Sequence, residues 1–72
     1  MTKTEHEILD ALVELEQAAS QMATAPIKPD LRPIFTRLDT LSAQLPADAP
    51  SDLRHYLQRK SYQKARVFLE QR

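Results

Sequence analysis

The chain has 72 residues, a formal net charge of zero, and neither cysteine nor glycine. A chain this short forms a single domain, residues 1–72, and buries only about 60% of the surface that its unfolded form exposes. The lack of cysteine excludes disulfides and thiolate metal sites, and the lack of glycine argues against phosphate-cradling loops and dinucleotide-binding folds.

The residue usage is typical of helices. Ala, Leu, Gln, Glu, Lys and Arg dominate, and β-branched residues are sparse. Tight two-residue β-hairpins usually contain Gly or Asn, and the chain has neither. We therefore predict an all-α fold, a small antiparallel bundle of three to four helices over approximately residues 4–23, 31–45, 51–59 and 61–71.

The first predicted helix begins with Thr4 as its N-cap and Glu7 three residues later, the spacing of a capping box. Its apolar stripe recurs at steps of four and three residues: Ile8, Leu12, Leu15, Ala19 and Met22. Leu9 and Val13 widen this stripe, so we expect the helix to contact two neighbouring helices or a partner. The helix should end near residue 23.

Residues 24–30 contain two prolines and predict a stiff linker before the second helix. Asp30 is the expected N-cap of that helix, and Pro33 is tolerated in its first turn. The apolar set comprises Ile34, Leu38, Leu41 and Leu45, flanked by Leu31 and Phe35. Pro46 ends the helix.

The remaining segment is expected to be capped by Asp48 or Ser51. We predict a break in it near Lys60 and Ser61, because two short helices separate apolar from charged faces more cleanly than one straight helix. Ser61 then acts as a second N-cap, and Lys64 points outward. The alternative is one bent helix, with the aliphatic stem of Lys60 lying along apolar surface.

The spacing of Tyr56, Tyr62, Ala65 and Leu69 resembles that around the inter-helix turn of a tetratricopeptide repeat. The resemblance covers residues 56–69, and it implies a helical hairpin at this point. Lys60 stands where that family usually has glycine, and the sequence contains no second repeat. We interpret the similarity as shared hairpin packing, and no peptide-binding function is carried over from it.

The apolar stripes together predict one core. Its expected members are Ile8, Leu12, Leu15, Ala19, Met22, Ile34, Phe35, Leu38, Leu41, Leu45, Leu53, Leu57, Ala65, Phe68 and Leu69.

The charges are sorted along the chain. Residues 1–24 carry five acids and one base, whereas residues 51–72 carry six bases and two acids. Two interpretations follow: the two ends attract each other within the fold, or the basic end faces an acidic partner. We expect mainly the first.

Side chains suited to catalysis or metal binding are few. His6 with Asp10, and His55 with Asp52, each supply at most half of a metal site. The four serines lack a Gly-x-Ser-x-Gly motif and suit capping or surface positions: Ser20, Ser42, Ser51 and Ser61. We therefore expect no enzymatic activity, no catalytic residues, no metal and no cofactor.

The favoured function is a small helical protein-interaction module that binds a protein partner or forms a homodimer. The candidate partner-binding residues are Leu9, Val13, Arg54, Arg59, Lys60, Lys64 and Arg66. The alternative is a nucleic-acid-associated accessory protein that uses the basic segment 54–66. No apolar core of a signal peptide and no apolar run of about 20 residues is present, so we expect a cytoplasmic location and no membrane partner.

Overall fold

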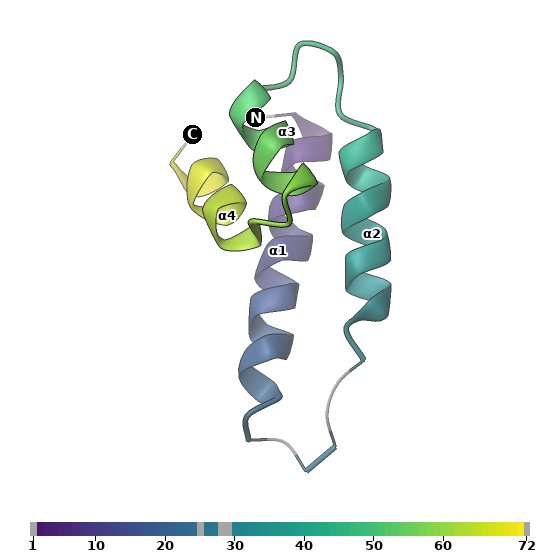
Figure 1. Ribbon diagram of the computed structural model, residues 1–72, viewed down its shortest axis with the longest axis vertical. Helices are drawn as coiled ribbons and strands as arrows, with labels where there is room; N and C mark the ends of the chain where they lie inside the picture. Colours follow the sequence, from purple (N-terminus) through teal and green to yellow (C-terminus); the bar gives the residue numbers. More distant parts are fainter. Residues whose placement is uncertain (1, 25, 28–29, 72) are drawn as a thin grey trace.

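The computed structural model describes residues 2–24, 26–27 and 30–71. These residues form four helices and no strand (Figure 1). The helices are α1 (Lys3–Gln21), α2 (Arg32–Ala43), α3 (Ser51–Gln58) and α4 (Tyr62–Glu70). The all-α prediction is confirmed. Of the predicted linker, residues 25, 28 and 29 lie outside the described part of the chain.

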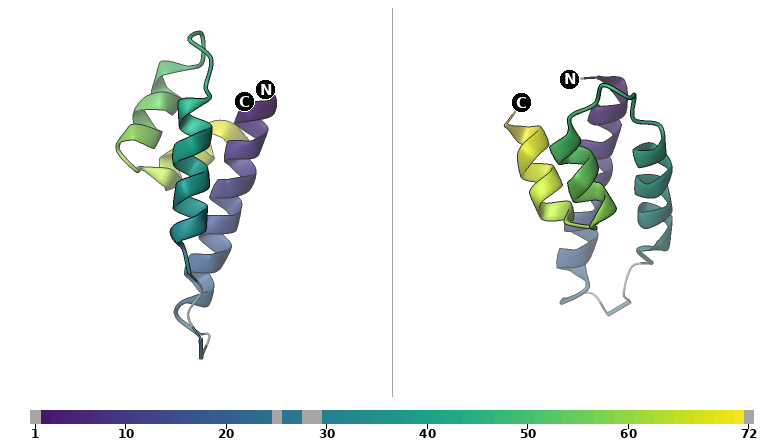
Figure 2. Two further views of the ribbon diagram at one scale, coloured as in Figure 1. Left: turned by 90° about the vertical axis from the view of Figure 1, so that its right-hand side faces the viewer. Right: turned by 45° about the horizontal axis from the view of Figure 1, so that its top comes forward.

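The helices pack in a ring in which each contacts the next and α4 returns to α1. The long helices α1 and α2 run antiparallel, and the short hairpin of α3 and α4 covers only the half of them nearest the N-terminus (Figures 1 and 2). The molecule is therefore elongated, 43 × 22 × 21 Å. Its radius of gyration is 12.5 Å, against about 11 Å for an average domain of this length.

The core lies where all four helices meet. Its buried apolar residues are Ile8, Ala11, Leu12, Ile34, Leu38, Leu41, Leu53, Leu57, Ala65 and Leu69. Leu15, Met22, Phe35, Leu45 and Phe68 were also predicted for the core and are half-buried.

Two alanines of α1 differ from the prediction. Ala11, which the predicted stripe omitted, is fully buried. Ala19, which the stripe included, is exposed. The stripe does continue along the helix, but α4 begins at Tyr62 and leaves the last turns of α1 without a covering helix. Periodicity identifies the inward face of a helix, whereas the length of the neighbouring helix decides how far that face is buried.

The start of α1 corrects the predicted cap. Thr2 is the N-cap, its hydroxyl accepts a hydrogen bond from the Glu5 amide at 3.2 Å, and it lies 3.2 Å from the Glu5 carboxylate. Thr4 lies inside the helix. The sequence contains two overlapping Thr-x-x-Glu spacings, and the earlier one lengthens the helix while placing Glu5 at 2% exposure.

The predicted caps of α2 and α3 are also displaced. Leu31 is the N-cap of α2, so Asp30 lies one residue earlier, although its carboxylate still accepts from the Arg32 amide at 3.0 Å. Pro50 is the N-cap of α3, and Ser51 is the first helical residue. Proline suits this position because the first backbone amides of a helix need no partner within it.

The predicted break between α3 and α4 is confirmed at Lys60 and Ser61, so the single bent helix was wrong. Lys60 adopts a left-handed conformation with φ of 58°. The Lys60 amide donates to the Leu57 carbonyl, and the Ser61 amide donates to the Tyr56 carbonyl. These two bonds form a Schellman motif, which glycine usually terminates. Lysine occupies the position here, in a chain that contains neither Gly nor Asn.

Tyr62 links the α3–α4 hairpin to α2. It is the first residue of α4, and its ring stacks on Phe35 of α2 with centroids 5.9 Å apart. Its hydroxyl oxygen is buried and has no hydrogen-bond partner in the described part of the chain. The ring therefore contributes apolar contact area, and the hydroxyl contributes little.

Candidate interaction surface

The outer side of the α3–α4 hairpin carries a shallow hollow of about 550 Å³. We call this surface the hairpin face. Its lining residues are Tyr56, Gln63, Lys64, Val67, Phe68 and Gln71. Val67 is 41% exposed and lies in the middle turn of α4. In the described part of the chain, Ile27 is the only other large hydrophobic residue this exposed.

The aromatic residues of the hairpin face are fixed by each other. Tyr56 and Phe68 pack edge to face, with ring centroids 6.3 Å apart and planes at 69°. Both are half-buried against the core. This contact already occupies one ring face. The two rings are therefore better suited to form the apolar floor of the hollow than to stack on nucleic-acid bases.

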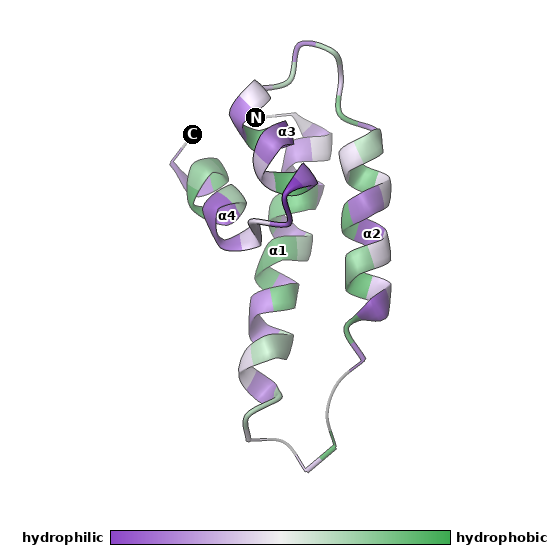
Figure 3. Cartoon of the chain, in the orientation of Figure 1, coloured by the Kyte–Doolittle hydropathy of each residue, from purple (hydrophilic) through white to green (hydrophobic). Residues whose placement is uncertain are grey.

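Three cations adjoin the hairpin face. Arg59 and Lys60 form the turn between the two helices, and Lys64 lies in the first turn of α4. All three are exposed. No ion pair within the described residues involves any of them. The end of α3 and this turn form a strongly hydrophilic region in Figure 3. No ion pair among the described residues therefore offsets the positive charge here.

The other predicted partner-binding residues lie elsewhere. Arg54 donates to the Pro46 carbonyl at 2.6 Å and holds the α2–α3 loop. Leu9 packs against the core. Val13 and Arg66 line a separate hollow between α1 and α4. Of the seven predicted residues, the structure thus places Lys64 in the hairpin face and Arg59 and Lys60 in the turn that precedes α4, and it assigns Arg54 and Leu9 to the fold.

The acidic and basic ends of the chain are paired only in part. Arg66 of α4 forms ion pairs with Glu16 of α1 and, at 3.4 Å, with Glu70. Arg37 of α2, from the middle of the chain, pairs with Glu14 of α1 at 3.3 Å. The expected attraction between the chain ends therefore operates through Arg66, and the cations of the hairpin turn take no part in it.

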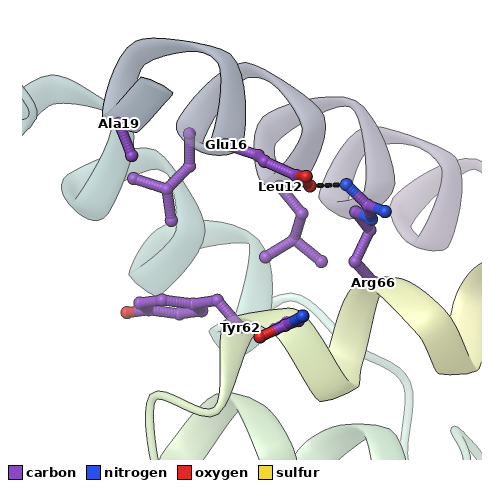
Figure 4. A pocket seen from close by; sticks show the side chains of 7 residues that line it. Leu12, Glu16, Ala19, Tyr62 and Arg66 are labelled. Carbon is purple, nitrogen blue, oxygen red and sulfur yellow. Dashed lines mark ion pairs between the residues drawn. The ribbon is translucent and has the colours of Figure 1, made fainter. Parts of the chain in front are cut away.

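A second pocket, of about 290 Å³, lies between α1 and α4 (Figure 4). We call it the α1–α4 pocket. Leu12, Ala19 and the ring of Tyr62 line it, and the ion pair of Glu16 with Arg66 closes one side. It lies beside the first residue of α4, where the part of α1 that α4 covers ends. Its charged groups satisfy each other, so it offers an apolar recess without an unpaired charge to attract a ligand.

The start of α2 also carries an electrostatic contact. The Arg32 guanidinium donates to the Asp30 carboxylate, with Nε 3.0 Å from Oδ1 and Nη2 2.9 Å from Oδ2. These side-chain bonds, followed by the bond from the Arg32 amide, lower the pKa of Asp30. The same contact raises the pKa of Arg32. This pair is fully exposed and stabilises the start of α2 locally.

No group of three metal-ligating side chains occurs within the described residues. Nor does any helix in this part of the chain combine the length and hydropathy that crossing a bilayer requires. Comparison with protein-family models, curated proteins and solved structures finds no match to the chain.

Sequence reasoning missed Gln63, Val67 and Gln71 as members of the surface. The signal for Val67 was present, because it falls outside both apolar stripes of the last segment. Phe68 was predicted as a core residue, and the structure places it, half-buried, at the boundary between core and hairpin face. A residue at such a boundary looks like any other core position in a one-dimensional pattern.

Proposed function

We propose that this protein is a small, non-enzymatic helical protein-interaction module that binds its partner through the hairpin face. The observation that carries the proposal is the exposed charge of Arg59, Lys60 and Lys64, which no ion pair in the described part of the chain offsets, beside the apolar floor around Val67. Exposed apolar surface rimmed by polar residues is typical of protein-binding sites.

A single partner of a different kind fits better than a second copy of this chain. The ring order of the helices places the α3–α4 side opposite the α1–α2 side, where Asp10 is exposed and Glu14 already pairs with Arg37. Charge pairing between copies would therefore be head-to-tail, and such contacts form rings or open filaments rather than closed dimers. Light scattering that gives a discrete homodimer would contradict this preference.

Nucleic-acid binding by segment 54–66 is the second candidate, favoured by the three unpaired cations. Two features weigh against it. Arg54 and Arg66 already have partners within the fold, so two of the cations in this segment are not free to contact phosphates. Tyr56 and Phe68 are also packed on each other.

Site-specific photocrosslinking in the native cell tests the proposal. A photoreactive amino acid at Val67 should give adducts that protease removes and nuclease does not. The same photoreactive amino acid at two control positions, Ala19 in the α1–α4 pocket and Thr40 on the exposed side of α2, should give no such adducts. Adducts from Ala19 alone would move the interface to the α1–α4 pocket, and nuclease-sensitive adducts would establish the second candidate instead.

A further inference from the structure

We infer that the ligand of the hairpin face is an acidic amphipathic helix, an identification that rests on the protein-interaction function proposed above. The face combines a shallow hollow, lined by one side of α4 and by Tyr56 of α3, with positive charge at one end that no ion pair among the described residues offsets. We call this hollow the groove. A helix that lays apolar anchors into such a groove is a recurring mode of peptide recognition.

The dimensions of the groove suit a helix of a few turns. Apart from Tyr56, its lining residues run from Gln63 in the first turn of α4 to Gln71, the C-cap of that helix. At 1.5 Å per residue, the nine residues of α4 measure about 13 Å, or two and a half turns. A partner helix of that length presents apolar side chains one turn apart, and these can contact Val67 and the Tyr56–Phe68 pair.

The cations beside the groove determine which charges a docked helix should carry next to its apolar side. Lys64 lines the groove itself, and Arg59 and Lys60 extend the positive region along the turn. Since no acid within the described residues pairs with them, carboxylates on a docked helix would supply their first opposite charges. A basic helix would meet repulsion at the same place.

Among the described residues, the other end of the hollow is neutral. Glu70 pairs with Arg66 on the side of α4 that faces α1, and the described lining beyond Lys64 consists of Val67, Phe68 and Gln71. A ligand whose acids are concentrated toward one end therefore matches the face better than a uniformly charged polyanion. This asymmetry favours an acidic helix over a nucleic-acid strand, in which charge is evenly spaced.

The direct test is a titration with a defined probe. The probe is a fluorescein-labelled peptide of about 15 residues, long enough for partial helicity, with leucines at i, i+4 and i+7 and glutamates on the flanks. A peptide of the same composition in scrambled order and a peptide with lysine in place of glutamate serve as controls. Fluorescence anisotropy gives the affinity, and amide chemical shifts locate the contact.

We expect the acidic amphipathic peptide to bind and to shift the amides of Tyr56, Lys64, Val67 and Phe68. The double variant Arg59→Glu/Lys64→Glu should weaken binding on the order of tenfold and prefer the lysine peptide. The control Lys3→Glu/Arg32→Glu changes the net charge equally at exposed positions that do not line the face, and should bind normally.

Equal binding of the scrambled peptide, shifts outside the hairpin face, or no binding at millimolar probe would overturn the inference. Tighter binding of an oligonucleotide than of the peptide would overturn it in favour of a polyanion. If the crosslinking from Val67 succeeds and the titration fails, the interaction function stands and the ligand is of another class. Failure of both removes the proposed function as well.

Discussion

The Ser61 amide donates a 2.8 Å hydrogen bond to the Tyr56 carbonyl across a turn in which Lys60 is left-handed. This bond ends α3 and directs α4 back along it, so the hairpin face exists because of this turn. An L-residue in the left-handed region costs roughly 1–2 kcal/mol, a cost that glycine does not carry.

Replacing Lys60 by glycine should therefore raise the free energy of unfolding by about 0.5–1 kcal/mol, because glycine's greater freedom in the unfolded chain offsets part of the gain. For a domain of this size, 1 kcal/mol corresponds to a rise of about 4–8 °C in Tm. Urea and thermal unfolding measure the change. Lys60→Ala removes the same charge but keeps the backbone cost, so it should not stabilise. Equal stabilisation by both variants would assign the effect to charge.

Thr2→Ala should destabilise the fold by about 0.5–2 kcal/mol, since it removes the side-chain acceptor for the Glu5 amide. Thr4→Ala is the matched control, because Thr4 lies within α1 and forms no cap. It should change the stability much less. Thermal unfolding of the two variants side by side distinguishes the observed cap from the one that the sequence suggested. A larger loss of stability for Thr4→Ala than for Thr2→Ala would identify Thr4 as the N-cap.

Tyr62→Phe should leave stability unchanged or increase it slightly. The variant keeps the ring that stacks on Phe35 and removes a buried hydroxyl without a hydrogen-bond partner in the described structure. Tyr62→Ala, which removes the ring, should cost on the order of 3 kcal/mol. Denaturant unfolding gives both values. A loss above about 1 kcal/mol for the phenylalanine variant would indicate that the hydroxyl has a partner.

The same substitution at two alanines of α1 tests the extent of the core. Ala11→Leu should destabilise the protein by about 1–3 kcal/mol, because Ala11 is fully buried and the added carbons have no space. Ala19→Leu should be tolerated, since its position is exposed beside the α1–α4 pocket. Calorimetry compares the two melting temperatures. Equal sensitivity at both sites would mean that α1 is covered along its whole length.

The contact between Asp30 and Arg32 predicts a titration change. The pKa of Asp30 is lowered by the Arg32 side chain and, secondarily, by the Arg32 amide, so Arg32→Gln should raise it only part of the way to its ordinary value. A lowered pKa in the fold contributes stability above the pKa of the unfolded chain, and this contribution is lost as pH falls through the folded pKa. Carboxyl chemical shifts followed over pH measure the change. An unchanged pKa would show that the pair does not persist in solution.

The fold class and the break at Lys60 were predictable because each rests on local information. Periodicity, composition and the absence of glycine and asparagine required no knowledge of distant contacts. The choice between Thr2 and Thr4, and the burial of Ala11 rather than Ala19, depended on which helices lie opposite α1. Those are tertiary facts that no window of sequence contains.

The candidate surface was predicted in part. Arg59, Lys60 and Lys64 were recognised from charge alone, and the structure leaves all three exposed. Arg54 and Arg66 belong to the same basic segment but satisfy a loop carbonyl and the acids of α1 and α4. Sequence gives the sign of a charge, and only the packing of the helices determines whether it already has a partner.

The return of α4 to α1 has a consequence for synthesis on the ribosome. The 40 residues between these helices take about 2–8 seconds to translate at 5–20 residues per second. During that interval the side of α1 that later packs on α4, including Leu12, has no covering helix from its own chain. The nascent chain therefore keeps this apolar side of residues 3–21 without its α4 partner until Leu69 and the rest of α4 reach their places in the core.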